Sequence, residues 1–248
     1  MTGTKIKATS KASLKRSSNS SNSSKSNNIR VKRPYVKKDK NLIYTPKNDK
    51  MKNLKFIKLP ECIQSILTTS YYRLDTMGGG DCLYHAVLGC ITEINPYFSK
   101  YLTVNEDKKL LFVYNFKKML YNDVLNYPYK YKEELTMVPN LPDRLLTMGT
   151  WAGEYEVLAI TKYLNLNIFV FQTLMNNDGT IKYCTSYCLS NYYIPLDITK
   201  NTIFIFNINN THYETILRFN EESIKGSFKP TEAIVKKVNK VYISQCSV

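Results

Sequence analysis

The stretch GEYEVLAITKYLNLNIFVFQ, residues 153–172, decides the fold class. Its first part, residues 153–165, carries Val157, Ile160 and Leu164 at helical spacing, which predicts an amphipathic helix. Its second part, NIFVFQ at 167–172, is a continuous apolar run with the length of a buried strand. A helix that leads directly into a buried strand indicates a sheet covered by helices.

Helices are expected before residues 153–172, and strands are expected after them. Helices are predicted over 59–70, where Pro60 stands near the start, over 82–91, and from a candidate capping box of Thr103 and Glu106 onward. The buried face of the last of these is expected to carry Leu110, Val113, Phe116, Lys117, Leu120 and Val124. Strands are predicted at 180–188, 202–208 and 213–219, the first of them after an NNDG turn. This order predicts an α+β fold with a small central sheet flanked by helices.

The positive charge of the chain is concentrated at its beginning. The net charge is +15, and residues 1–50 alone carry 14 Lys and Arg against two Asp. Because this segment is also rich in Ser and Asn and poor in apolar residues, residues 1–50 are predicted to be a disordered basic tail. The basic cluster at 30–40 is a candidate for contact with nucleic-acid phosphates or for a nuclear address, and the alternative is a tail that only keeps the protein in solution. A folded domain over 54–220 and a basic C-terminal extension over 221–248 are expected to follow.

Two classes of protein are disfavoured by the composition. No apolar run reaches the length that a membrane span needs, and the Lys/Ser-rich beginning does not look like a secretory signal. The expected location is intracellular, cytoplasmic or nuclear. The six cysteines show no framework spacing, so they are interpreted as free thiols. Cys184 and Cys188 have no second pair of ligands nearby, and neither a metal nor a cofactor is predicted.

The segment MGGGDCLYHAV, residues 77–87, contains the residues best suited to chemistry. Cys82 follows three glycines and opens a predicted helix, where backbone N–H groups and the positive helix end favour a thiolate. Glycines let the backbone approach a substrate carbonyl, so the amides of Gly79, Gly80 and Cys82 are a candidate oxyanion hole.

A thiol nucleophile needs a base, and the chain has only two histidines. His85 lies three residues after Cys82 on the same predicted helix, which is a poor position for reaching the sulfur. His212 lies between two late strands, in NNTHYE at 209–214, from where a side chain can project across a cleft. Glu214, on the same face of the strand, and Asn210 are the candidate groups that orient it.

Three blocks together resemble the ovarian-tumour (OTU) family of cysteine proteases: GDCLYHAV at 80–87, GTWAGEYEVLAITKYLNLNIFVF at 149–171, and NNTHYETI at 209–216. The resemblance covers about residues 60–220 and implies a papain-like fold. It also implies an enzyme that removes ubiquitin or a ubiquitin-like modifier from lysine, with Cys82 as nucleophile and His212 as general base. Trp151 is expected to be a structural anchor of the block at 149–171.

The sequence departs from the family pattern at two positions. The family usually has an acid three residues before the cysteine, where this chain has Gly79, and Asp81 is the candidate for a shifted acid. The residue two positions after the histidine is usually Asp or Asn, and here it is Glu214. The alternative interpretation is therefore a catalytically impaired OTU-like module that binds ubiquitin while the basic tail holds nucleic acid. The Lys/Asn/Tyr/Ile-rich composition suggests a large DNA virus as source.

Overall fold

The computed structural model describes residues 43–44, 53–176, 178, 180–188, 196–220 and 223–246. The predicted basic tail lies outside these residues, except for strand β1, Ile43–Tyr44, which pairs antiparallel with β2, Phe56–Lys58. An isoleucine and a tyrosine favour extended backbone, so here the prediction of disorder is wrong. Contact with nucleic acid through residues 1–50 stays a prediction.

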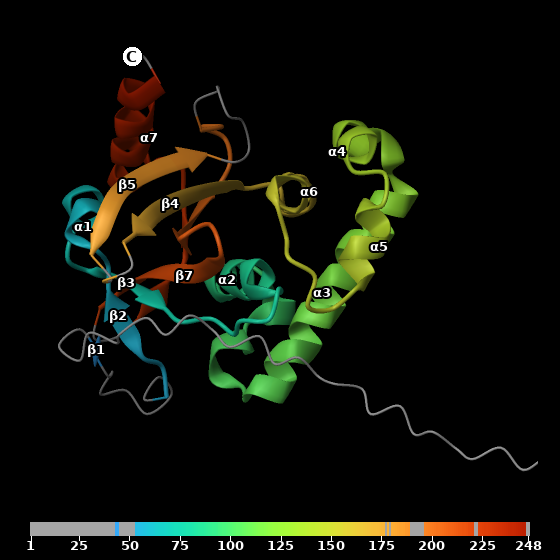
Figure 1. Ribbon diagram of the computed structural model, residues 1–248, viewed down its shortest axis with the longest axis horizontal. Coiled ribbons are helices and arrows are strands. Elements are labelled where there is room, and N and C mark those ends of the chain that lie inside the picture. Colours follow the sequence, from blue (N-terminus) through green and yellow to red (C-terminus); the bar gives the residue numbers. More distant parts are fainter. Residues whose placement is uncertain are drawn as a thin grey trace, which may run out of the picture. The chain divides into compact units, whose positions relative to one another are not determined.

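The described elements follow a mixed order of helices and strands (Figure 1). After β1 and β2 come α1 (Glu61–Leu67), β3 (Tyr71–Leu74), α2 (Cys82–Cys90), α3 (Glu106–Asn126), α4 (Lys132–Met137), α5 (Leu141–Leu146), α6 (Glu154–Leu164), β4 (Asn167–Met175), β5 (Ile181–Cys188), β6 (Thr202–Ile208), β7 (His212–Phe219), β8 (Ile224–Lys225), β9 (Ser227–Phe228) and α7 (Ala233–Cys246). Short 3₁₀ turns lie at Pro96–Phe98, Tyr101–Thr103 and Pro128–Tyr131. The α+β class predicted from the sequence is confirmed.

The strands of the described residues form one mixed sheet in the order β1-β2-β3-β7-β6-β4-β5, with β8 beside β7 and β9 beside β6. The β4–β6 pair is parallel, and the other pairs are antiparallel. Strand β7 therefore lies inside the sheet between β3 and β6, although β3 precedes it by about 140 residues. This placement brings the region of Cys82 close to the late strand that carries His212.

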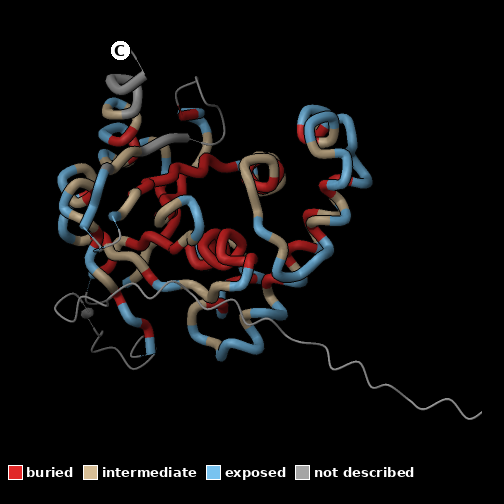
Figure 2. Tube along the Cα trace, viewed as in Figure 1, coloured by how far each residue is buried: buried red, intermediate tan, exposed pale blue. Residues whose placement is uncertain are grey.

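Strands β4 and β6 each contain a continuous apolar run, at 168–171 and 203–206, because helices cover both faces of the sheet. Ile168 and Val170 of β4 join the cluster formed with α2, α3 and α6, whereas Phe169 and Phe171 join the cluster formed with α1 and α7. Helix α2 is buried along all nine residues, as Figure 2 shows, so it is a core helix and not one with a single apolar face.

Helix α3 differs from its prediction at its beginning. Its N-cap is Asn105, whose side chain accepts a hydrogen bond from the Lys108 backbone N–H at 3.1 Å, in place of the expected Thr103 capping box. Leu110, expected on the buried face, is 39% exposed, and the fully buried residues of the helix begin at Val113. The other predicted core positions, Lys117 included, are buried.

Two parts of the sheet were not expected. The early strands β1, β2 and β3 were missed because each is four residues or shorter. The predicted extension over 221–248 contributes β8, β9 and α7, and Phe228, Val235 and Val238 belong to the core cluster on the α1/α7 face. Residues 223–246 are therefore part of the packed domain and not an appendage. In the described part of the chain, no helix combines the length and apolar character that crossing a bilayer requires.

Candidate active site

Cys82 is the first residue of α2 and directly follows a tight glycine turn. Gly79 and Gly80 have φ of +104° and +100°, a backbone region that favours glycine. A Cβ on Gly80 would lie 2.0 Å from the carbonyl oxygen of Gly149, whereas a Cβ on Gly79 would meet nothing within 4 Å. The turn is therefore closed by protein on its Gly80 side and open on its Gly79 side. Cys82 itself is 4% exposed.

Asp81, the candidate shifted acid, has both carboxylate oxygens engaged in a buried network. Oδ1 pairs with Lys117 Nζ at 2.7 Å, and Oδ2 accepts a hydrogen bond from the Gly149 backbone N–H at 2.6 Å. The same ammonium group donates to the Thr147 carbonyl oxygen at 2.7 Å. Asp81 forms no ion pair with His212, so the structure gives it a role in holding the 147–149 segment against the glycine turn.

His212 is the first residue of β7 and lies beside Cys82. The turn before it contains Asn209 and Asn210, both with positive φ, and is fixed by a 2.7 Å hydrogen bond from the Met175 backbone N–H to Asn209 Oδ1. The imidazole Nε2 lies 3.5 Å from Asp75 Oδ1. The imidazole also interacts with the thiol of Cys82.

The electrostatic surroundings favour a protonated His212. Its burial alone would lower its pKa, but the hydrogen bonds with Asp75 and Cys82 and the negative charge of Glu214 outweigh this and raise the pKa to about 9. The arrangement thus places a proton donor beside a thiol, which is the pair of groups that thiol-dependent hydrolysis uses.

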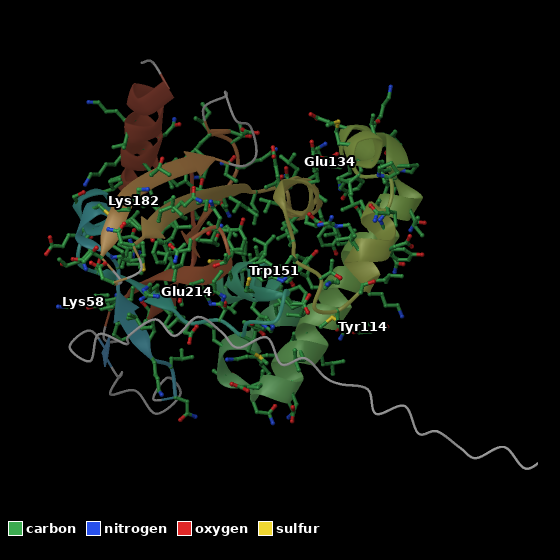
Figure 3. All side chains as sticks on the ribbon, viewed as in Figure 1. Lys58, Tyr114, Glu134, Trp151, Lys182 and Glu214 are labelled. Carbon is green, nitrogen blue, oxygen red and sulfur yellow. The ribbon has the colours of Figure 1, made fainter. Side chains whose placement is uncertain are left out.

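Glu214, labelled in Figure 3, is farther from the imidazole than Asp75 is. Its Oε1 lies 4.0 Å from His212 Nε2, and its Oε2 pairs with Arg73 Nη1 at 2.5 Å. Glu214 is 3% exposed, and this burial raises its pKa despite the charge of Arg73. The candidate orienter predicted from the sequence is therefore held mainly by Arg73.

Asp75 was missed by the sequence reasoning, and its position depends on an unpredicted strand pair. In the β3–β7 register Leu74 lies opposite Thr215, so Asp75 continues the ladder at the level of Glu214. Thr76 Oγ1 donates a hydrogen bond to the Tyr213 carbonyl oxygen and holds the segment after β3 against β7. No local motif around Asp75 signals this contact, because it depends on residues about 140 positions apart.

The other sequence candidates lie elsewhere. Asn210 is exposed in its turn, and among the described residues it makes no hydrogen bond to His212. His85 is buried in α2, where its Nδ1 lies 2.5 Å from the Tyr101 hydroxyl oxygen. Burial lowers the pKa of His85 to about 4, so this histidine is neutral at physiological pH.

The block at 149–156 is anchored by a carboxylate and not by its tryptophan. Glu156 Oε2 accepts a hydrogen bond from the Gly153 backbone N–H at 2.7 Å, and Oε1 pairs with Arg144 Nε at 2.5 Å. Arg144 also donates to the Trp151 carbonyl oxygen at 3.0 Å. The Trp151 side chain, labelled in Figure 3, is 58% exposed, so the prediction that it anchors the block is wrong.

One group of side chains in the site has a spacing that a metal ion could bridge. The ligand atoms of Asp75, His212 and Glu214 all lie within 4.8 Å of one another. Glu214 is already paired with Arg73, and His212 already contacts Cys82. The arrangement therefore fits acid–base chemistry at the thiol at least as well as metal binding.

Comparison with known proteins gives similarity at the level of structure. No protein-family model and no curated protein matches the chain. Among solved structures, the OTU domain of OTUD1 is similar with a TM-score of 0.43 and 18% identity, over 63% of this chain and 91% of that one. An ovarian tumour (OTU) domain solved in complex with ubiquitin has a TM-score of 0.40 and 16% identity, over 71% and 85%.

A viral structure is similar to the same degree. The Hazara virus OTU bound to ubiquitin has a TM-score of 0.40 and 12% identity, over 73% of this chain and 97% of that one. A viral source for the present chain stays a prediction. The solved structures named above, and the viral and cellular ones with similar scores, are described as OTU domains or OTU proteins.

Proposed function

We propose that the protein is a thiol-dependent hydrolase that cleaves the isopeptide bond between the C-terminal glycine of ubiquitin, or a ubiquitin-like modifier, and a lysine. The observation that carries the proposal is the thiol of Cys82 in contact with an imidazole whose pKa is raised to about 9, with the Asp75 carboxylate on the other side of the ring. The choice of modifier rests on the sequence resemblance.

The chemistry follows from these groups. The Cys82 sulfur attacks the carbonyl carbon of the glycine, and the amides of Gly79, Gly80 and Cys82 stabilise the oxyanion. The C–N bond then breaks, and His212 transfers its proton to the leaving lysine amine. In the second half, His212 takes a proton from water, and the resulting hydroxide displaces the sulfur from the thioester. The products are the free lysine amine, a glycine carboxylate whose acid proton passes to the amine or to solvent, and the regenerated thiol–imidazole pair.

The geometry of the glycine turn favours a substrate whose C-terminal residues have no side chains. Gly79 has open space on its Cβ side, and Cys82 is nearly covered by protein. A Gly-Gly tail has no side chains that would clash near such a sulfur, whereas a bulky residue at the scissile bond would. This supports a substrate whose chain ends in glycine, as ubiquitin and its relatives do.

The test is covalent labelling with a ubiquitin probe that carries a thiol-reactive group at its C-terminus. The wild-type protein is compared with Cys82→Ala, with His212→Ala, and with Cys62→Ala as a control for a thiol outside the site. An adduct on wild type and Cys62→Ala, lost in Cys82→Ala and slowed in His212→Ala, is the expected result. An adduct that persists in Cys82→Ala would refute the assignment of the nucleophile.

A second candidate function is a ubiquitin-binding module with impaired catalysis. The observation that favours it is the distance from His212 Nε2 to the two nearest carboxylates, 3.5 Å to Asp75 and 4.0 Å to Glu214, which is long for an orienting hydrogen bond. This candidate predicts that wild type binds unmodified ubiquitin but neither reacts with the probe nor cleaves a ubiquitin–lysine isopeptide bond.

A further inference from the structure

Outside the candidate active site, the described thiols fall into two kinds. Cys90 lies inside the core, where its Sγ is 3.3 Å from the Phe204 carbonyl oxygen and burial raises its pKa to about 12. Such a thiol is neither accessible nor ionised near neutral pH. Cys62 and Cys184, in contrast, are both partly exposed. They are the reactive candidates apart from Cys82 among the cysteines whose side chains are described.

These two thiols meet although 122 positions separate them in the sequence. Cys62 is the second residue of α1, and Cys184 lies in the middle of β5. Both pack against the same aromatic cluster on the α1/α7 face, and their thiols lie close enough to interact. Figure 1 shows α1 beside β5.

We propose that Cys62 and Cys184 form a disulfide when the folded protein meets a peroxide, and that this pair is an oxidation site separate from the nucleophile. Two thiols in contact need little backbone movement to reach disulfide geometry. Cys82 opens α2, which belongs to the cluster on the other face of the sheet. Bond formation between Cys62 and Cys184 therefore leaves the active-site thiol unchanged.

The oxidation proceeds in two steps, and either sulfur can take the first. The balance is the same in both cases, and Cys62 serves as the example. The Cys62 sulfur attacks one peroxide oxygen, the O–O bond breaks, and a sulfenic acid and one water form. The Cys184 sulfur then displaces hydroxide from the sulfenic sulfur, and its proton leaves with that hydroxide as a second water. Two electrons pass from the thiols to hydrogen peroxide.

The disulfide would restrain the edge strand β5. Strand β5 is the last strand of the sheet and pairs only with β4 in the order of the described strands. Edge strands open more readily than central ones. A bond from Cys184 to Cys62 would tie this edge to α1 and close a loop of more than a hundred residues, which restricts the unfolded chain strongly.

The test uses the full chain with Cys82→Ala, so that the nucleophile does not consume peroxide. The folded protein is treated with hydrogen peroxide, free thiols are blocked, and peptides are mapped without reduction. Trypsin releases Cys62 on peptide 59–73 but leaves Cys184 and Cys188 together on 183–200, so a Cys188→Ser version resolves the partner. The expected result is a cross-link between peptides 59–73 and 183–200 in both versions, together with a thermal midpoint at least about 5 °C higher that dithiothreitol reverses.

Several outcomes would overturn the proposal. A cross-link that involves Cys188 or Cys246 in place of Cys184, a bond between two chains, or separate oxidation of Cys62 and Cys184 without a bond would each do so. Cys62→Ser and Cys184→Ser serve as matched controls, and each is expected to lose the cross-link and the rise in thermal midpoint. Because the map is made on protein that retains both cysteines, the result does not depend on whether these variants fold.

Discussion

Replacing Lys117 by methionine is expected to destabilise the protein more than any surface lysine replacement would. The ammonium group is 1% exposed, pairs with Asp81 at 2.7 Å, donates to the Thr147 carbonyl oxygen, and lies 4.7 Å from the centre of the Tyr84 ring. Methionine fills a similar volume but leaves Asp81 with the Gly149 N–H as its remaining partner in this network.

The expected loss of stability follows from the burial of Asp81, which stays in the protein interior when Lys117 is replaced. Removing one partner of a buried ion pair costs about 3–5 kcal/mol, because the other charge remains buried and uncompensated. For a domain of this size, that corresponds to a fall of about 6–20 °C in the thermal midpoint. The loss should be smaller in the double variant Lys117→Met with Asp81→Asn, because the asparagine is neutral and can still accept the hydrogen bond from Gly149.

The chain offers a matched control in Lys130. Its ammonium group also pairs with an aspartate, Asp123, at the same 2.7 Å, but the two side chains are 32% and 16% exposed. Lys130→Met is therefore expected to cost less than about 1 kcal/mol. The assay is urea unfolding followed by fluorescence for wild type, both single variants and the double variant. Equal losses in Lys117→Met and Lys130→Met would refute the reasoning, as would a double variant no more stable than Lys117→Met.

Three further predictions concern the candidate site. Gly80→Ala should lower the unfolding free energy more than Gly79→Ala, by at least about 1–2 kcal/mol in urea titrations, because both strain a positive φ but only Gly80 lies against a carbonyl oxygen. A smaller loss in Gly80→Ala would contradict this. The pKa of His212 rises from 6.5 to about 9 on folding, so its contribution to stability is complete below pH 6.5 and is lost as the pH rises to about 9. Wild type should therefore lose stability across this window relative to His212→Gln, and parallel pH profiles would exclude the effect. Asp75→Asn should lower the pKa of His212 more than Glu214→Gln does in an NMR titration, because Asp75 is nearer. The reverse order would make Glu214 the orienting group.

Cys82 and His212 are the candidate nucleophile and base that the sequence indicates. Cys82 stands after a glycine run at a helix start, and His212 is one of two histidines, so local pattern and elimination were enough to nominate them, and the three OTU-like blocks supported the choice. The structure places both in contact, while their catalytic roles stay predictions. The burial of His85 could not be predicted in the same way. It depends on the packing of α2 on all of its sides, which the neighbouring sequence does not indicate.

The supporting residues could not be found in this way because they depend on distant partners. Asp75 reaches His212 only through the β3–β7 pair, and that pair joins segments about 140 residues apart. Lys117 fell on the periodic face of its helix, yet nothing nearby in sequence indicated that Asp81 would neutralise it. Three buried apolar residues in the lysine-rich segment at 221–248 were likewise too few to mark it as core.

The position of β7 inside the sheet has a consequence for how the protein becomes reactive during its synthesis. Cys82 leaves the ribosome 130 residues before His212, and the two meet only after β7 has inserted between β3 and β6. Pairings over such sequence separations form late and slowly in folding. A growing chain that ends before β7 therefore holds an ordinary thiol at position 82. The reactivity proposed for that thiol should appear together with the completed sheet, in a single kinetic phase of refolding.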